Sequence, residues 1–369
     1  MMRFEKVKKQ LGFGCMRLPM QGSEVDYPAL TKMIDAFMSK GFNYFDTASV
    51  YIEGKSEIAL KACLVNRYPR EQFVYTNKLS SSLFQTEEEI RPLFEKQLQA
   101  CGLTYFDFYL MHAQNKDNYQ KYKQTHAYET AYALKAEGKI KHVGLSFHDQ
   151  AEVLDRILTE QPQIEVVQIQ LNYLDMEDPK IQSRLCYEVC RKHQKPIIVM
   201  EPVKGGSLVH IPPKAQNLFD QLGSHSYASY AIRYAASFEG VMMVLSGMSN
   251  EEQMNDNLSY MEEFQPLSRQ EYSIIQQVKD IIKKANAIPC TGCRYCVEGC
   301  PEQIDIPDIF TCLNDVHGQQ IDHIKEKYQT YTFQKGKAKD CIACGKCEKT
   351  CPQHLEIRKL LKKASWYLD

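Results

Sequence analysis

A carboxylic acid and a phenol stand five residues apart where an apolar run ends. Residues 42–45 indicate a buried strand, Asp46 follows them directly, and Tyr51 lies on the loop before the turn marked by Gly54. A phenol can donate a proton to a reacting group, and a carboxylate can hold a neighbouring cation in place. On this stretch alone a structural role is equally open, with the aspartate capping a turn and the tyrosine covering a core.

Two more polar residues follow the next predicted strands. Lys78 comes after Tyr75-Thr76-Asn77, and His112 comes after the apolar Tyr109-Leu110-Met111. Singly, such a lysine would be a solvated charge and such a histidine a hydrogen-bonded structural group. Four polar residues at the ends of three successive strands instead indicate one shared chemical site.

Eight of the fourteen cysteines form two short groups after residue 289, and the groups share one spacing. They are Cys290-x-x-Cys293-x-x-Cys296-x-x-x-Cys300-Pro301 and Cys341-x-x-Cys344-x-x-Cys347-x-x-x-Cys351-Pro352. Three thiolates at three-residue intervals can wrap an iron–sulfur cube. Zinc is the alternative, although it favours paired cysteines and does not need the third. The six other cysteines are expected to be small buried hydrophobes: Cys15, Cys63, Cys101, Cys186, Cys190 and Cys312.

The elements that must position these residues alternate between apolar runs and amphipathic helical patterns. The predicted strands are 11–16, 42–46, 73–77, 106–111, 142–146, 166–171, 196–200 and 241–246. The predicted helices are 29–40, 56–66, 86–100, 125–137, 151–159, 181–193 and 226–238, with another from about residue 250.

Eight strand–helix units within about 240 residues favour an α/β fold of the closed (β/α)8 TIM-barrel type. No glycine-rich dinucleotide motif follows the first strand, which weakens the alternative of an open doubly wound sheet. In such a barrel the active face lies at the carboxyl ends of the strands, where Asp46, Lys78 and His112 are predicted to be.

A second domain is expected after the barrel. A capped helical stretch begins at Ser268, and Ile288-Pro289 breaks the pattern just before the first cysteine. We therefore divide the chain into a barrel over residues 1–285 and a small, mainly helical iron–sulfur domain over residues 286–369.

Composition narrows the range of partners. The chain has 369 residues, with 45 basic and 46 acidic ones, and a formal net charge of −1. This balance gives no reason to expect nucleic acid or an anionic membrane as a partner. The first residues show no signal-peptide core and no apolar run approaches membrane-spanning length, so a cytoplasmic location is expected.

The first part of the chain resembles the aldo-keto reductase superfamily over roughly residues 8–258. The motifs that carry the resemblance are Leu11-Gly12-Phe13-Gly14-Cys15-Met16-Arg17-Leu18, Phe45-Asp46-Thr47-Ala48 with Tyr51 and Gly54-Lys55-Ser56-Glu57, Thr76-Asn77-Lys78, and Asp107-Phe108-Tyr109-Leu110-Met111-His112. The resemblance implies an oxidoreductase that reduces a small aldehyde or ketone with a nicotinamide cofactor. Its catalytic tetrad would be Asp46, Tyr51, Lys78 and His112, with Tyr51 as the proton donor and His112 orienting the carbonyl oxygen.

The resemblance also implies cofactor contacts. Those residues are Gly14, Met16, Arg17, Ser146, Gln168, Glu201, Val203, Lys204, Gly205, Gly206, Gly247, Ser249, Gln253 and Asn257. Ser146 and Gln168 would hold the nicotinamide amide, residues 201–207 would border the pyrophosphate, and residues 247–257 the adenosine phosphate. NADP(H) is the family expectation, but residues 249–258 contain no lysine or arginine, so NAD(H) stays an alternative.

The cysteine region resembles bacterial two-cluster ferredoxins, and its long segment between the motifs resembles the helical ferredoxin domains of fumarate reductase. The resemblance implies two [4Fe-4S] clusters that share ligands between the motifs. One would use Cys290, Cys293, Cys296 and Cys351, and the other Cys341, Cys344, Cys347 and Cys300.

Two functional hypotheses stay open. The first is an NAD(P)H-linked carbonyl reductase whose clusters either are structural or exchange electrons with a redox partner protein. The second is an electron-transfer or redox-sensing protein that uses the barrel as a nicotinamide-binding platform. The unsubstituted tetrad favours the first hypothesis, because a binding platform does not need it.

Overall fold

The computed structural model describes residues 4–223, 225–284, 288–316 and 321–369. The chain forms two compact units. The first contains Met1–Val203 and Leu222–Ile275, and the second contains Lys204–Gln221 and Gln276–Asp369. The domain boundary predicted at residues 285 and 286 lies outside the described residues.

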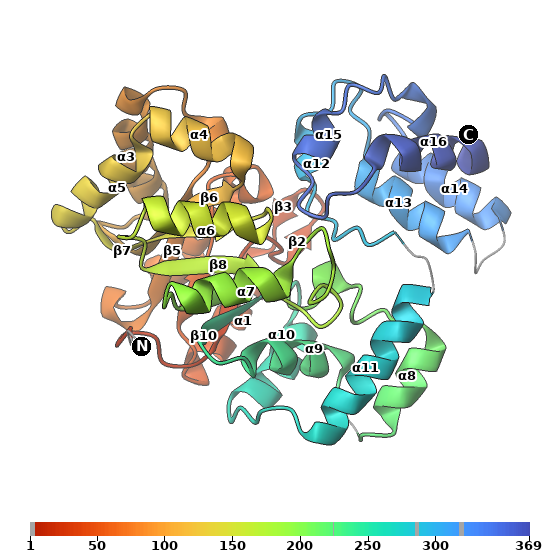
Figure 1. The fold of residues 1–369 in the computed structure, drawn as a ribbon, viewed down its shortest axis with the longest axis horizontal. Coiled ribbons are helices and arrows are strands. Elements are labelled where there is room, and N and C mark those ends of the chain that lie inside the picture. The colour runs from red at the N-terminus through yellow and green to blue at the C-terminus, as the bar shows by residue number, and fades with distance from the viewer. Residues whose placement is uncertain (1–3, 224, 285–287, 317–320) are drawn as a thin grey trace. The chain divides into compact units, whose positions relative to one another are not determined.

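The first unit is a closed parallel barrel (Figure 1). Its strands are β1 (Leu11–Gly14), β4 (Tyr44–Asp46), β5 (Val74–Leu79), β6 (Phe106–Gln114), β7 (Ile140–Phe147), β8 (Val166–Gln170), β9 (Ile197–Met200) and β10 (Val241–Ser246). Each strand pairs in parallel with its neighbours in sequence, and β1 closes the ring by pairing with both β4 and β10. All eight predicted strands are present, so the predicted (β/α)8 fold is confirmed.

Helices follow the strands at all the predicted positions. They are α1 (Tyr27–Ser39), α2 (Lys55–Leu60), α3 (Glu87–Cys101), α5 (Ala127–Ala136), α6 (Ala151–Glu160), α7 (Ser183–Lys192), α9 (Tyr227–Ala236), α10 (Glu251–Met261) and α11 (Arg269–Lys284). The sequence patterns did not predict α4 (Lys116–Gln124), α8 (Pro213–Asp220) or the hairpin of β2 (Met20–Gln21) and β3 (Glu24–Val25). Helix α4 is rich in lysine, and its main signal is a capping box between Asn115 and Asn118.

Side chains pointing inward fill the barrel. One buried cluster consists of Phe4, Tyr44, Val74, Phe108, Leu110, Val166, Ile198, Met243 and Leu245. Successive side chains of a strand point to opposite faces, so alternate residues of each strand enter this cluster and their neighbours pack on the helices. The barrel interior is therefore a packed core, and polar groups gather only toward the strand ends.

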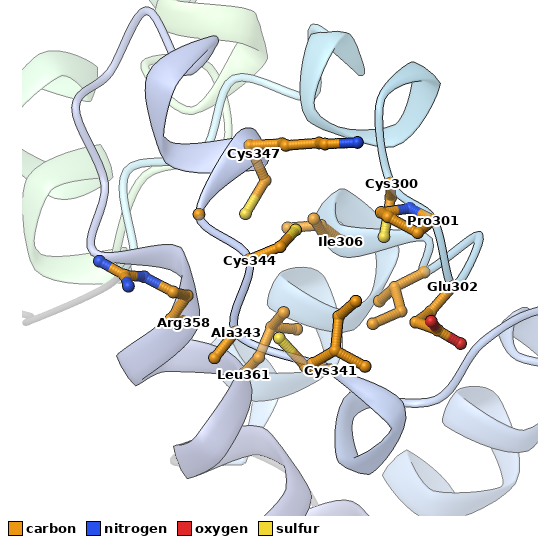
Figure 2. Close-up of a pocket in the computed structure, with 14 residues that line it drawn as sticks. Cys300, Pro301, Glu302, Ile306, Cys341, Ala343, Cys344, Cys347, Arg358 and Leu361 are labelled. Atoms are coloured by element: carbon orange, nitrogen blue, oxygen red, sulfur yellow. The ribbon is translucent and has the colours of Figure 1, made fainter.

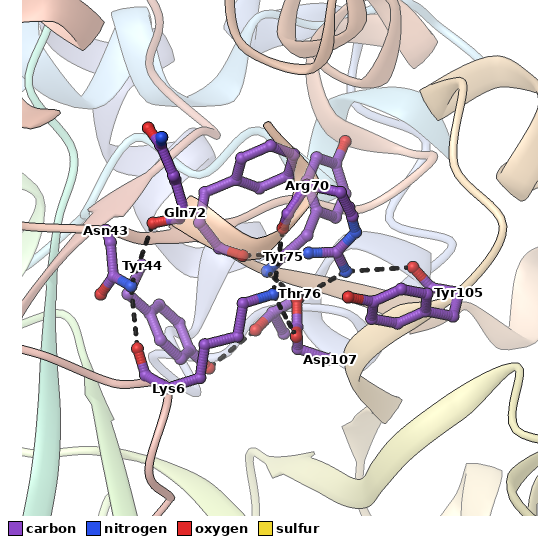
Figure 3. Close-up of polar contacts among 10 residues, drawn as sticks. Lys6, Asn43, Tyr44, Arg70, Gln72, Tyr75, Thr76, Tyr105 and Asp107 are labelled. Carbon is purple, nitrogen blue, oxygen red and sulfur yellow. Dashed lines mark hydrogen bonds and ion pairs between the residues drawn. The ribbon is translucent and has the colours of Figure 1, made fainter. Parts of the chain in front are cut away.

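An ion network ties the amino-terminal segment to the start of β5 and β6 (Figure 3). The buried carboxylate of Asp107 accepts hydrogen bonds from Lys6 Nζ at 2.9 Å and from Arg70 Nη2 at 2.6 Å. It also accepts one from the backbone N–H of Tyr75 at 2.8 Å. Asn43 donates to the carbonyl of Lys6 at 2.8 Å. Asp107 begins the motif that ends at His112. The first residue of this motif therefore makes structural contacts, whereas the last belongs to the predicted tetrad.

The second unit is mainly helical, as predicted. Besides α8 it contains α12 (Tyr295–Glu298), α13 (Ile306–Asp315), α14 (Ile321–Tyr331), α15 (Lys346–Lys349) and α16 (Ile357–Leu368). Its core includes Ile309, Phe310 and Leu361 and is separate from the barrel core. The six cysteines outside the two motifs are all buried, as predicted. In the described ranges no helix is both long enough and apolar enough to cross a membrane.

Candidate functional site

The barrel brings the predicted acid and lysine into direct contact. Asp46 is the last residue of β4, and Lys78 lies near the end of the adjacent strand β5. Lys78 Nζ lies 2.5 Å from Asp46 Oδ1 and donates to the carbonyl of Thr47 at 2.8 Å. Both side chains are almost fully buried. They form an ion pair at the carboxyl end of the strands.

Tyr51 reaches this pair through an unusual turn. Ile52, Glu53 and Gly54 all have positive φ values, of 52°, 55° and 85°. Such a conformation is costly for a β-branched residue and persists only where the surrounding structure enforces it, most often at functional sites. The Tyr51 ring centre lies 4.7 Å from Lys78 Nζ and 5.9 Å from the ring centre of His112, edge to face.

Buried hydrogen bonds hold the Tyr51 turn against β5. Glu57 accepts from Ser49 at 2.8 Å and from Asn77 at 2.7 Å. Gln97 of α3 donates to the carbonyl of Lys78 at 2.9 Å and to Ser49 Oγ at 2.6 Å. Glu57 and Asn77 appear in the sequence motifs without a predicted role, and Gln97 is not predicted at all. A glutamine inside a helical pattern gives no signal of its own.

Burial shifts the pKa values of three tetrad residues, Asp46, Lys78 and His112. It raises the pKa of Asp46 and lowers the pKa of Lys78, and the ion pair opposes both shifts. Burial also holds the pKa of His112 well below its usual range, helped by the charge of Lys78. His112 is therefore neutral, and its Nδ1 lies 2.6 Å from Ser80 Oγ. If Ser80 donates in this bond, Nε2 of His112 carries the proton and can donate.

Ser146 and Gln168 lie beside the tetrad. They are direct partners across β7 and β8, so their side chains project from the same face of the sheet. Gln168 Nε2 lies 3.4 Å from Asp46 Oδ2, and Ser146 Oγ accepts from the backbone N–H of Ala113 at 2.8 Å. This pair of buried polar groups can recognise a planar amide, so it fits a nicotinamide.

Other predicted cofactor residues meet where β1 and β10 end. Ser249 donates to the carbonyl of Arg17 at 3.1 Å, and a side-chain atom at Gly247 would lie 3.7 Å from the carbonyl of Gly14. Met16 lies between Gly14 and Arg17 in the same loop. Helix α10 starts there, capped by the side chain of Asn250. A helix start of this kind can accept a phosphate group.

Two of the predicted cofactor residues, Gln253 and Asn257, make hydrogen bonds within the protein. Gln253 accepts from the backbone N–H of Ser249 at 2.8 Å. Asn257 is buried, donates to Ser246 at 2.7 Å and accepts from Tyr260 at 2.5 Å, so its side chain supports the end of β10. Glu201 and Val203 follow β9 in the first unit, whereas Lys204, Gly205 and Gly206 belong to the second.

The second unit gathers the cysteines in the two predicted sets. Cys300, Cys341, Cys344 and Cys347 line one cavity (Figure 2). Cys290, Cys293, Cys296 and Cys351 line another. Each set takes three cysteines from one motif and one from the other. Four thiolates around a cavity form a donor set that suits an iron–sulfur cube. In the parts of the chain that the structure describes, no group of three or more histidine, cysteine or acidic side chains is arranged for a single metal ion.

A polar tetrad at the carboxyl end of a closed parallel barrel, followed by two four-cysteine cavities, defines an oxidoreductase with an iron–sulfur domain. The family model described as the aldo/keto reductase family matches residues 10–280, and the chain belongs to this family. The model of the 4Fe-4S dicluster domain matches residues 289–356. The predicted family, the iron–sulfur domain and the two cofactor classes are thereby confirmed at the level of domains.

Curated relatives are distant. The glyoxal reductase of Bacillus subtilis is 27% identical over 180 residues, which are 48% of this chain and 60% of that protein. An uncharacterized oxidoreductase of the same organism, YqkF, is 23% identical over 281 residues, 68% of this chain and 86% of its own. The NADH-specific methylglyoxal reductase of Escherichia coli is 27% identical over 46% of this chain and 54% of its own. The chain thus spans little more than half of two of these relatives.

Solved structures share the barrel. The holo form of the aldo-keto reductase AKR11C1 from Bacillus halodurans superposes with a TM-score of 0.60 at 22% identity, covering 73% of this chain and 92% of its own. An aldo-keto reductase from Klebsiella pneumoniae, solved in complex with NADPH, gives 0.59 at 17% identity, covering 74% and 95%. At these sequence identities, the comparison shows only that these structures and this chain share a fold.

Proposed function

We propose that this protein reduces an aldehyde or ketone with NAD(P)H, using Tyr51 as the proton donor. The observation that carries the proposal is the Tyr51 ring beside the Lys78 ammonium, which is itself paired with Asp46. A bound nicotinamide supplies the hydride in this class of reaction. The protein must then stabilise and protonate the carbonyl oxygen as negative charge develops on it.

Each tetrad residue has a distinct task in this proposal. The charge of Lys78 favours loss of the Tyr51 proton, and Asp46 keeps Lys78 in place. Neutral His112 donates a hydrogen bond to the carbonyl oxygen through Nε2, with Ser80 setting its tautomer. Ser146 and Gln168 would hold the amide of a bound nicotinamide beside Asp46.

The choice of nicotinamide cofactor is open between NADPH and NADH. Residues 249–258 carry no lysine or arginine that could pair with a 2′-phosphate. The names of the relatives cover both cofactors, since one is NADH-specific and another was solved with NADPH. Binding of each nucleotide by the purified protein decides between them.

We propose the two cysteine sets as the ligands of two [4Fe-4S] clusters that exchange electrons with a redox partner protein. Cys344 is exposed, and Ile342 beside it is 60% exposed, so the cluster held by that set would lie near the surface. Residues 335–369 contain nine lysines and arginines but only four acidic residues. A basic surface attracts an acidic partner and speeds its association.

The alternative function, electron transfer or redox sensing without carbonyl reduction, rests on this same cysteine set, of which Cys344 is exposed. The tetrad separates the two hypotheses, because sensing does not require a proton donor beside a buried lysine. The zinc alternative predicts a protein without acid-labile sulfide, which iron and sulfide analysis tests directly.

The experiment measures oxidation of NADPH and NADH by anaerobically purified protein with a panel of small aldehydes and ketones. We expect turnover that Tyr51→Phe reduces by about 10²- to 10⁴-fold. Tyr27→Phe is the matched control, because this tyrosine is 39% exposed and lies outside the tetrad. Turnover that is equal in Tyr51→Phe and the wild type would overturn the assignment of the proton donor.

Nucleotide titration without substrate tests the coupling of the two cofactors. Cofactor fluorescence reports binding, and visible absorbance reports cluster reduction in the same sample. Binding with cluster reduction would link the two redox centres. Binding without it would separate them and favour electron exchange with a partner alone.

A further inference from the structure

The two cysteine cavities come from one internal repeat, but their surroundings differ. Thr291 and Ile342 occupy equivalent positions, each directly after the first cysteine of its motif. Gln353 and Glu302 are equivalent in the same way, each directly after a Cys-Pro pair. Thr291 and Gln353 are 3% and 5% exposed, whereas Ile342 is 60% exposed. Other residues therefore cover the cavity beside Thr291 and Gln353, whereas the cavity beside Ile342 is open to solvent there.

Part of that cover is the segment Lys204–Gly206, which belongs to the same unit. Lys204 is buried, and its Nζ donates to Gln353 Oε1 at 2.7 Å. A buried ammonium group is costly unless it is hydrogen-bonded, so this contact stabilises one conformation of the segment. Gln353 also lines the cavity of Cys290, Cys293, Cys296 and Cys351.

Gly205 packs directly on the first cysteine motif. A Cβ atom at Gly205 would lie 2.2 Å from the carbonyl oxygen of Thr291 and 2.5 Å from its Cα. Gly205 also has a φ of +64°, which favours glycine. The backbones of the two segments therefore approach more closely than any other residue type would allow. Thr291 lines the same cavity as Gln353.

The segment Lys204–Gly206, which contacts Thr291 and Gln353, is also part of the predicted nucleotide site. It follows β9, which ends at Met200, and it is the segment that resembles the pyrophosphate-bordering loop of aldo-keto reductases. Two residues that line one cysteine cavity, Gln353 and Thr291, thus contact two of the predicted cofactor residues, Lys204 and Gly205.

We propose that Thr291 and Gln353 are positioning residues for the segment Lys204–Gly206. Through them, the cluster bound by Cys290, Cys293, Cys296 and Cys351 holds this segment in the conformation that binds the nicotinamide nucleotide. Nucleotide affinity then depends on occupancy of this cluster, and the second cluster has no such effect. The proposal rests on the proposed function, since it assumes that the segment contacts the nucleotide.

The physical reason is that the cluster orders its own ligand loops. Thr291 directly follows the ligand Cys290, and Gln353 lies two residues after Cys351. A cluster held by these four cysteines would fix the backbones of both loops. Without it, the loops that carry Thr291 and Gln353 gain conformational freedom, and the nucleotide must order Lys204–Gly206 when it binds.

The test compares Gln353→Leu with Glu302→Leu, its equivalent in the other half of the repeat. The measurements on holoprotein are iron and sulfide content and the Kd of NADPH and NADH from cofactor fluorescence. We expect Gln353→Leu to retain both clusters and to weaken nucleotide binding by about tenfold, the usual effect of losing a hydrogen bond to a charged group. Glu302→Leu is expected to leave the Kd unchanged. Equal Kd values in both variants and the wild type would overturn the proposal.

Two more variants distinguish the proposed effect from a general folding defect. Gln353→Glu keeps an acceptor for Lys204 and is expected to restore nucleotide binding. In a Lys204→Met background, Gln353→Leu is expected to have no further effect, because it acts through that lysine. Additive losses would mean that Gln353 does not act through Lys204, which would also overturn the proposal.

Hydrogen exchange gives a readout that is independent of the nucleotide. Amides of residues 204–210 are expected to exchange faster in Gln353→Leu than in the wild type, with no change in Glu302→Leu. A wild type that binds neither nucleotide would refute the proposed function, whereas unchanged exchange and affinity in Gln353→Leu would refute only this inference.

Discussion

Lys78 Nζ lies 2.5 Å from Asp46 Oδ1 and 4.7 Å from the centre of the Tyr51 ring. The Lys78 ammonium group therefore has two close neighbours, the carboxylate of Asp46 and the ring of Tyr51. Because burial penalises both charges, the pair is retained at a cost in stability and indicates a chemical role.

Removing either member of this ion pair is expected to damage both stability and turnover. Asp46→Asn and Lys78→Met each leave a buried charge without its ionic partner, which costs about 3–5 kcal/mol. The double variant is expected to lose less than the sum of the two, because no lone charge remains. Chemical denaturation and kcat with a carbonyl substrate check this. Lys32→Met is the control, since the Lys32–Glu251 pair is solvent-exposed. Strict additivity of the two losses would contradict a coupled pair.

The neutral state of His112 predicts a defined pH dependence. Its pKa lies well below 6.5 because of burial and the charge of Lys78, whereas the unfolded chain takes up a proton near pH 6.5. The unfolded state therefore binds more protons below about pH 6.5, and the free energy of unfolding falls with decreasing pH there, by up to about 1.4 kcal/mol per unit. His112→Gln is expected to remove this slope in denaturation experiments at several pH values.

His126 provides a control of opposite sign. This exposed histidine pairs with Glu87, which raises its pKa. The stability that this pair contributes is fully present below the pKa of His126 in the unfolded chain. It is lost as pH rises through the pKa of His126 in the folded protein. His126→Gln should therefore reduce stability at low pH and not at high pH. A His112→Gln profile that matches the wild type would mean that His112 titrates normally.

The network at the other end of the barrel is expected to affect stability alone. Asp107→Asn leaves Lys6 and Arg70 without their shared carboxylate, which costs about 3–5 kcal/mol for a buried group. Its kcat at low temperature is expected to equal that of the wild type, because Asp107 lies at the opposite end of β6 from His112. Asp35→Asn, at an exposed pair with Arg67, serves as the control and should cost about 1 kcal/mol or less.

The crossed cysteine sets predict the outcome of double substitutions. Cys300→Ser is expected to lower iron and sulfide by about half, since it removes one of two clusters. Adding Cys344→Ser should remove no more, because both residues line one cavity. Adding Cys293→Ser should remove the rest, because Cys293 lines the other cavity. The opposite pattern would show that each motif ligates its own cluster. Cys312→Ala, in the helical core, is expected to retain all the iron.

Local patterns were enough to predict most of the fold. The eight strands are continuous apolar runs between helical repeats, because both faces of a barrel strand are covered. Helix α4 was missed since its nine residues have few apolar positions, and the hairpin β2–β3 is too short to show a period. Support residues such as Gln97 were also missed, because a contact between α3 and β5 has no local signature.

The sequence by itself determined the residue types and their order: the tetrad at successive strand ends, and two copies of a cysteine motif. Motif chemistry and strand order are local properties, and local properties can be read along the chain. Only the tertiary structure decided that the turn at Ile52 brings Tyr51 to Lys78 and that Lys204 pairs with Gln353 across 149 positions. Such contacts depend on packing between distant segments, and no spacing along the chain encodes them.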